Sequence, residues 1–290
     1  MQWQTDWGLR ARMALTILLL FGLYVVFVGV LTAYFENLLI PVVLLGSFSL
    51  VQYFFSDKLA LRSMGASRVE ASEYPGLHDR VGRLSQQADL PKPDVAVADS
   101  RTPNAFATGR SPDSAVVCVT TGLLDALDSE ELEGVLAHEL AHVKNRDVAV
   151  MTIASFLSTI AFLVVRFGWL FGGRNRNGAP VVVAIVVSLV VWVVSFLLIR
   201  ALSRYREFAA DSGAATITGQ PSALASALAT ISGRMDRVPE EDLREQAEMN
   251  AFFIIPISTG IVGRLARTHP PTEKRIEQLR ELEREMETVA

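Results

Sequence analysis

The chain has 290 residues, half of them hydrophobic, and its mean hydropathy of +0.32 is high for a soluble domain. Charged residues make up 20%, below the roughly 25% typical of globular chains, so a membrane protein with a soluble part is expected. The net charge of −4 indicates no nucleic-acid partner. The single cysteine, Cys118, excludes an intrachain disulfide, and its apolar neighbours predict a buried structural thiol.

The N-terminal part of the chain contains two long apolar blocks. Ala11 to Phe35 is long enough to cross a bilayer, and too long for the apolar core of a cleaved signal peptide. After the minimal turn Glu36-Asn37, a second block runs from Leu38 to Phe55. Pro41 lies in the first turn of that block, where its missing N–H costs little. The two blocks predict a tight transmembrane hairpin.

Residues 56–147 have the composition of a soluble segment. Apolar residues at helical spacing predict a helix over Tyr74 to Ala88, and two strands are expected at Asp94–Asp99 and Ser114–Thr120. Asp128 followed three residues later by Glu131 is the pattern of a capping box, so a helix should begin there. The continuous apolar face of that helix predicts that it is buried against the strands.

Two further apolar blocks follow, at Val148–Phe171 and Ala179–Ile199. The rest of the chain is soluble in composition, and Thr268-His269-Pro270-Pro271 is a sharp break within it. Helices are expected over 203–216, 221–233 and 272–288.

The pattern therefore predicts four segments: a transmembrane hairpin at 1–55, a soluble segment at 56–147, a second hairpin at 148–199 and a soluble segment at 200–290. Ten lysines and arginines lie within about 20 residues of the blocks on one side of the membrane, and only Arg174 and Arg176 on the other. By the positive-inside rule, both termini and both soluble segments should be cytoplasmic.

The central motif is His138-Glu139-Leu140-Ala141-His142. Residues four apart on a helix lie on one face, so the two histidines can bind one metal ion. Glu139, about 100° round the helix, can reach a water activated by that metal. The motif predicts a zinc-activated hydrolase, and with four histidines in the chain a chance match is rare.

The third ligand that a catalytic zinc needs is not fixed by this motif. His78, His269 and Glu207 are the candidates. Glu207 and Asp211 are four residues apart, on one helix face, where like charges are unfavourable unless each has its own partner. A metal for Glu207 and an imidazole N–H for Asp211 would supply those partners. An ordinary charged helix beside the membrane is the alternative.

Four motifs in the same order resemble the HtpX family of membrane zinc metalloproteases, which are gluzincins related to the CAAX prenyl endopeptidases. They are Pro103–Gly109, His138–His142, Ser203–Asp211 and Thr268–Ile276. The resemblance implies a mainly helical zinc protease domain with a small β-sheet, one zinc per chain, Glu207 as its third ligand and Asp211 as support for a zinc-binding histidine.

The same resemblance implies that the chain holds its substrate in extended form. Asn104, Ala105 and Phe106 are expected in an edge strand that binds the substrate. A hairpin turn bearing a core phenylalanine is the alternative.

The expected reaction is zinc-assisted hydrolysis of a peptide bond, with Glu139 as general base and then acid. His269 is the candidate oxyanion donor, unless it only braces the Pro-Pro turn. The substrates implied are membrane-associated polypeptides, namely misfolded or damaged membrane proteins, in a quality-control or stress-response role. A catalytically silent scaffold with a structural zinc is the main alternative. A transporter is disfavoured, because the four blocks contain no acidic residue and, after Arg12 at the start of the first block, only Arg166 among basic ones.

Overall fold

The computed structural model describes residues 7–34, 47, 50–51, 53–167, 179–235 and 269–289. The chain divides into two compact units. One, called here the sheet unit, contains Phe55–Val148 and Arg206–Ala290; the other, the helical unit, contains Asp6–Phe54 and Ala149–Tyr205. Each unit is discontinuous in sequence, and helix α8 (Ala179–Thr218) contributes residues to both.

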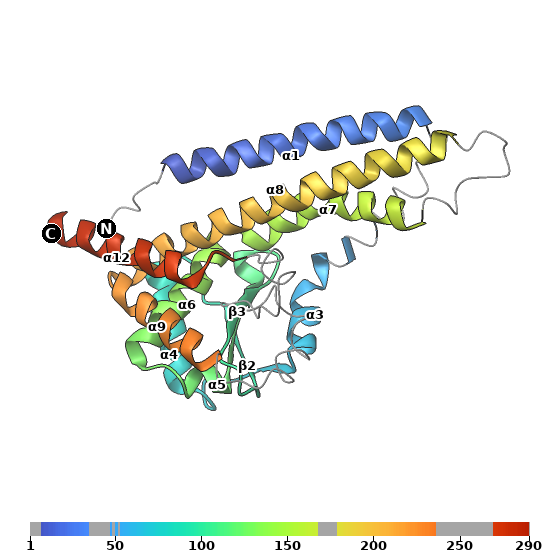
Figure 1. The fold of residues 1–290 in the computed structure, drawn as a ribbon. Coiled ribbons are helices and arrows are strands. Elements are labelled where there is room, and N and C mark those ends of the chain that lie inside the picture. Colours follow the sequence, from blue (N-terminus) through green and yellow to red (C-terminus); the bar gives the residue numbers. More distant parts are fainter. Residues whose placement is uncertain are drawn as a thin grey trace. The chain divides into compact units, whose positions relative to one another are not determined.

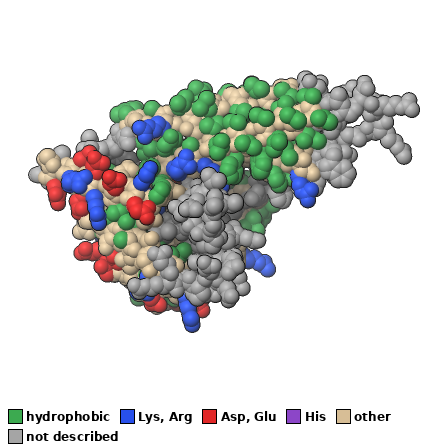
Figure 2. Space-filling model, viewed as in Figure 1, with side chains coloured by type: hydrophobic (Ala, Val, Ile, Leu, Met, Phe, Trp, Pro, Cys, Tyr) green, Lys and Arg blue, Asp and Glu red, His purple; other side chains and the backbone are tan. Residues whose placement is uncertain are grey.

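The helical unit contains α1 (Trp7–Tyr34) and most of α7 (Asp147–Phe167) and α8 (Figure 1). These are the three helices, in the part of the chain that the structure describes, that are long and apolar enough to cross a membrane. Hydrophobic side chains cover much of their outer surface (Figure 2), and Leu18 is 64% exposed. Such a surface is that of a multi-pass membrane protein. Most of the second predicted block, 38–55, lies outside the described residues.

Polar side chains link the helices inside the helical unit. The Tyr24 hydroxyl of α1 donates a hydrogen bond of 2.7 Å to the Ala154 carbonyl of α7. The Ser195 hydroxyl of α8 donates one of 2.8 Å to the Ser158 hydroxyl of α7. Between apolar helices such a bond contributes about 1 kcal/mol.

The sheet unit is built on a four-stranded mixed sheet in the order β1-β2-β4-β3. The central strands β2 and β4 are parallel, whereas β1 and β3 pair antiparallel to them at the two edges. The strands at 94–99 and 114–120 expected from the sequence are confirmed with slightly shorter bounds. The strand bounds are β1 (Ala66–Arg68), β2 (Asp94–Ala98), β3 (Ala105–Thr108) and β4 (Val116–Thr120).

Helices cover both faces of this sheet. One face contacts the motif helix α6 (Ser129–Lys144), and α3 (Ser56–Ser63) contributes to the cluster on the other face. The predicted helices at 74–88, 203–216, 221–233 and 272–288 are all confirmed, and α3 and β1 are additional elements. The remaining helices are α4 (Pro75–Gln87), the 3-10 turn η1 (Pro112–Ser114), α5 (Thr121–Leu124), α9 (Pro221–Met235) and α12 (Thr272–Val289).

The capping box predicted at the start of α6 is present. The Asp128 side chain accepts from the backbone N–H groups of Glu130 and Glu131, and the Glu131 side chain accepts from the Asp128 N–H. Glu131 also accepts hydrogen bonds from Ser226 and Thr230 of α9. Local sequence thus fixes where α6 begins, and the same glutamate ties that end to α9.

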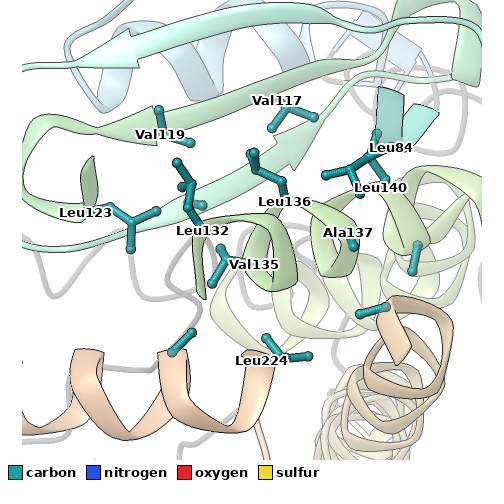
Figure 3. Packing of buried hydrophobic residues seen from close by; sticks show 14 of the residues in the cluster. Leu84, Val117, Val119, Leu123, Leu132, Val135, Leu136, Ala137, Leu140 and Leu224 are labelled. Carbon is teal, nitrogen blue, oxygen red and sulfur yellow. The ribbon is translucent and has the colours of Figure 1, made fainter. Parts of the chain in front are cut away.

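The apolar residues of α6 point in two directions (Figure 3). Leu136 points toward Val117 and Val119 of β4, while Val135 points toward Leu224 of α9. All five side chains are at most 1% exposed. Burial of one such side chain stabilises the fold by about 1.5–3 kcal/mol, so α6 is held firmly between the sheet and α9.

Gly134 permits the close approach of α6 to α9. A Cβ at this position would lie 2.8 Å from the Leu224 nitrogen and 3.0 Å from the Leu224 Cα, both backbone atoms. No side chain can therefore be added without moving one helix. Gly134 lies about one helical turn before His138, so this contact sets the position of the motif relative to α9.

Candidate metal centre

His138 and His142 lie one above the other on α6, as their spacing predicts. Their Nε2 atoms are 3.1 Å apart, and their ring planes are nearly perpendicular at 87°. His138 is 1% exposed, whereas His142 is only partly buried. Two imidazole nitrogens that converge in this way can share one cation.

Glu207 of α8 brings a carboxylate to the same point. Its Oε2 lies 3.6 Å from His138 Nε2, and its Oε1 lies 3.5 Å from His142 Nε2. Ligand atoms of the three residues all lie within 4.8 Å of one another. Of the three candidates for a third ligand, Glu207 is therefore the one that the fold brings to both histidines in this way.

The donor atoms of this cluster fit a metal ion. Glu207 Oε2 is buried and accepts no hydrogen bond, although His269 Nδ1 lies 2.8 Å from it. Each imidazole is engaged with a carboxylate through Nδ1, which leaves the two Nε2 atoms directed at Glu207. A buried carboxylate oxygen and two imidazole nitrogens are the donor set that zinc prefers.

The electrostatic surroundings of His138 also favour a cation. Burial and the nearby Arg275 both disfavour the imidazolium form, yet bonds to Asp211 and Glu207 outweigh them and raise the pKa of His138 to about 9. The same carboxylates would stabilise a divalent ion between the ligand atoms.

Both histidines are oriented by aspartates. His138 Nδ1 lies 2.9 Å from Asp211 Oδ1, and His142 Nδ1 lies 2.5 Å from Asp147 Oδ2. An N–H donated to a carboxylate in this way fixes the tautomer and leaves Nε2 as the ligand atom. Asp211 was expected in this role, whereas Asp147 was missed. The available signal was its position as the first carboxylate after the motif.

Two arginines complete the cluster, and neither was recognised from the sequence. Arg275 of α12 contacts Asp211, and Arg206 of α8 lies 2.8 Å from Asp147 Oδ1. Arg275 is within the Thr268–Ile276 motif, which was the one available indication of its importance. Arg206 directly precedes Glu207, but nothing in its spacing distinguishes it from its neighbours Arg200 and Arg204.

Glu139 directly follows His138 on α6, lies beside the cluster and is 5% exposed. Its Oε2 accepts a hydrogen bond of 2.8 Å from the backbone N–H of Ala107 in the edge strand β3. Burial raises the pKa of Glu139, and the nearby His138 and His142 partly offset that rise. A carboxylate whose pKa is raised in a buried site is suited to accept a proton and return it.

The residues expected to bind substrate lie in or next to β3. Asn104 precedes the strand and is fully buried, while Ala105 packs in the main core. Phe106 belongs to the smaller cluster on the opposite face of the sheet, with Ala96 and Cys118. The side chain of Phe106 is thus a core side chain, and the backbone is the part of β3 that reaches Glu139.

The other singled-out residues are placed as follows. His269 joins the cluster through its contact with Glu207, whereas the Nε2 of His78 is 3.0 Å from the Val69 carbonyl oxygen. Cys118 is fully buried in the sheet, and burial raises the pKa of its thiol to about 12, with Glu139 adding to the rise. Such a thiol is inert, as expected from the sequence.

The chain matches a known family and several named proteins. The model of peptidase family M48 matches residues 71–283. "Protease HtpX homolog 2" of Methanosarcina acetivorans is 56% identical over 98% of this chain and 99% of its own length. "Protease HtpX homolog" of Moorella thermoacetica is 52% identical over 98% and 97%, and "Protease HtpX homolog 1" of Streptomyces coelicolor is 51% identical over 98% and 96%.

A solved structure is similar in fold. The crystal structure of S. mikatae Ste24p has a TM-score of 0.55 and 18% identity, and the match covers 94% of this chain and 66% of that one. This similarity supports the membrane metalloprotease fold with a small sheet that the motifs predicted.

Proposed function

The chain belongs to peptidase family M48 and is a membrane metalloprotease, and we propose that it is a zinc-dependent endopeptidase acting on misfolded or damaged membrane proteins at the cytoplasmic face. The observation that carries this proposal is the convergence of ligand atoms from His138, His142 and Glu207 within 4.8 Å. Glu139 lies on α6, the helix that also bears the two histidines. The sequence spacing, the buried donor atoms and the family membership all support it.

In this proposal His138, His142 and Glu207 hold one zinc ion per chain. Zinc would supply Lewis-acid polarisation of the scissile carbonyl and would make water acidic enough to attack at neutral pH. Three protein ligands are typical of catalytic rather than structural zinc sites, which are closed by four. Asp211 and Asp147 each accept the Nδ1 proton of one histidine and so hold its Nε2 toward the ion.

Glu139 is proposed as the general base and acid. It accepts a proton from the attacking water and returns the proton to the leaving amine. The hydrogen bond from Ala107 restrains one carboxylate oxygen of Glu139. The raised pKa of Glu139 suits a group that must both take and release a proton. His269 is proposed to donate to the oxyanion, because its ring lies beside Glu207 at the edge of the ligand set.

Strand β3 is proposed to bind the substrate backbone. In the part of the chain that the structure describes, β3 is an edge strand, paired with β4 on one side. In an antiparallel pair alternate residues direct their N–H and C=O groups outward, and the Ala107 N–H already points out of the ladder to Glu139. Ala105, two residues before Ala107, would offer its backbone groups to an extended peptide laid along this edge, whereas the N–H and C=O of Asn104 are bonded to Thr120.

Two features of the chain support the proposed orientation and substrate class. The excess of lysine and arginine at one end of the apolar blocks supports a cytoplasmic site and cytoplasmic termini. His142 is followed within five residues by Asp147, the first residue of the apolar helix α7. A cleavage site so near a span in sequence favours polypeptides that are themselves in or at the membrane.

The test is proteolysis and zinc content in three variants of the full chain purified in detergent, with casein as the substrate. Glu139→Gln should lose cleavage and keep one zinc, whereas Glu207→Ala should lose the zinc. Glu130→Gln is the control, because Glu130 is exposed on the same helix. Unchanged cleavage in Glu139→Gln would remove its assignment as the base. Zinc in a wild-type chain that cleaves nothing would favour the silent scaffold.

A further inference from the structure

Side chains of the metal centre form two similar series of contacts, each made of a histidine, an aspartate and an arginine. In the first, His138 Nδ1 meets Asp211 Oδ1, and Arg275 binds both oxygens of Asp211. The Arg275 Nε donates to Oδ2 at 2.9 Å and its Nη2 donates to Oδ1 at 2.7 Å. The contact is therefore bidentate, and Arg275 and Asp211 are both 1% exposed.

The second series of contacts has the same order: histidine, aspartate, arginine. His142 Nδ1 meets Asp147 Oδ2, and Arg206 Nε lies 2.8 Å from Asp147 Oδ1. Asp147 is 3% exposed and Arg206 is 9% exposed. Arg206 Nε forms an ion pair here without a directed hydrogen bond. Each histidine of the motif is thus held by an aspartate that is itself held by an arginine.

The arginines also set the total charge of the site. Among the described residues, every buried charged side chain except Glu131 belongs to this cluster. Its carboxylates are Glu139, Asp147, Glu207 and Asp211, and its guanidinium groups are Arg206 and Arg275. Histidines that bind a metal ion are neutral, so the four ionised carboxylates and two guanidinium groups then leave two unbalanced negative charges, which one divalent cation would neutralise. Unbalanced buried charge is costly, so this matching favours a divalent ion.

From these contacts we propose that Arg275 and Arg206 are positioning residues for the metal centre. Each holds an aspartate so that one oxygen faces an imidazole Nδ1, and together they adjust the site to the charge of a divalent cation. This inference rests on the proposed zinc site and deepens it, since it identifies two residues outside the proposed ligand set. Arg275 also approaches that set directly, with Nη1 3.5 Å from Glu207 Oε2 and Nη2 3.3 Å from His138 Nε2.

The two arginines differ in what a substitution must preserve. Arg275 uses two N–H groups in the fixed geometry of a guanidinium, and a lysine cannot reproduce that fork. Arg206 makes a single ion-pair contact with Asp147, which a lysine of similar reach can replace. A residue that only fills space would show no such difference between its lysine and methionine variants.

The experiment measures the zinc dissociation constant of the full chain in detergent by competition with a chelator of known affinity. Arg275→Met and Arg275→Lys should both bind zinc about 10- to 100-fold more weakly, the usual effect of losing support for a ligand. Arg206→Met should be weakened similarly, whereas Arg206→Lys should stay close to wild type. Arg280→Met on α12 and Arg204→Met on α8 are the matched controls and should not change the affinity.

The outcomes separate this inference from the proposed function. A wild-type chain without zinc would overturn the proposed function itself. Zinc affinity at the wild-type level in Arg275→Lys, or in Arg206→Met, would overturn the positioning role while leaving the proposed function intact. Thermal melting in excess zinc checks that each variant is folded. If the Arg275 variants fail to fold, the Arg206 pair decides the question through the difference between lysine and methionine.

Discussion

The backbone N–H of Ala107 donates a hydrogen bond of 2.8 Å to Oε2 of Glu139, 32 residues later in the chain. This contact joins the edge strand β3 to the helix that bears both metal-ligand histidines. It restrains the proposed base from the strand proposed to bind the substrate, so a change in β3 should alter the reaction without altering the metal.

Ala107→Pro tests that connection. Proline lacks the N–H, and an outward position on an edge strand is where a sheet tolerates it. We expect kcat/KM to fall by about 10- to 100-fold, because a hydrogen bond to a charged group contributes about 1.5–3 kcal/mol. Zinc content should be unchanged. Ala107→Ser keeps the N–H and is the control; equal activity in both variants would show that the bond does not orient Glu139.

His269→Gln tests the oxyanion assignment. Loss of one oxyanion donor typically lowers kcat by about 10²–10³-fold, and zinc content should stay at one per chain. His78→Gln is the control, because His78 is outside the metal centre and its Nε2 lies 3.0 Å from the Val69 carbonyl oxygen. A variant of His269 that instead releases zinc would reassign the residue to holding Glu207, whose Oε2 lies 2.8 Å away.

Removal of the metal should destabilise the sheet unit. Zinc at about a thousand times its dissociation constant stabilises the folded state by about 4 kcal/mol. For a unit of this size, that loss corresponds to a fall of about 10 °C in the melting temperature. Thermal melting with and without a chelator measures it, and added zinc should restore the value. Glu207→Ala should show no shift on chelation; a shift of wild-type size would place the metal elsewhere.

Gly134→Ala should destabilise the protein by about 1–3 kcal/mol, the usual cost of overpacking. The added methyl group would meet the backbone of Leu224 at 2.8 Å. Gly233→Ala is the matched control on α9, since a Cβ there meets nothing within 4 Å, and it should stabilise the helix by about 0.5–1 kcal/mol. Denaturant melts measure both, and equal stability in the two variants would contradict the close helix contact.

The local features of the fold were predictable because they depend on neighbours in sequence. The capping box at Asp128 and Glu131 needs residues three apart, and both of its hydrogen bonds are present. The convergence of His138 and His142 needs residues four apart on a helix, and their Nε2 atoms are indeed 3.1 Å from each other. Apolar block length predicted the long helices for the same reason.

The orientation of Phe106 shows where such reasoning stops. Side chains alternate between the faces of a strand, so its direction depends on the register with β4, where it pairs with Cys118. That register puts Phe106 in the smaller core cluster and leaves the Ala107 backbone facing Glu139. A difference of one residue would reverse both, and no sequence pattern in the stretch distinguishes the two.

The sequence by itself determined the metal-binding motif, the apolar helices and, through family motifs, the pairing of that motif with Glu207 and Asp211. Only the tertiary structure decided that Asp147, Arg206 and Arg275 complete the site. The reason is that these partners come from three other helices, of which α8 and α12 are distant from the motif in sequence. Most charged residues in the described part of the chain are at least partly exposed to solvent, and burial by the fold alone distinguishes the few that must be paired.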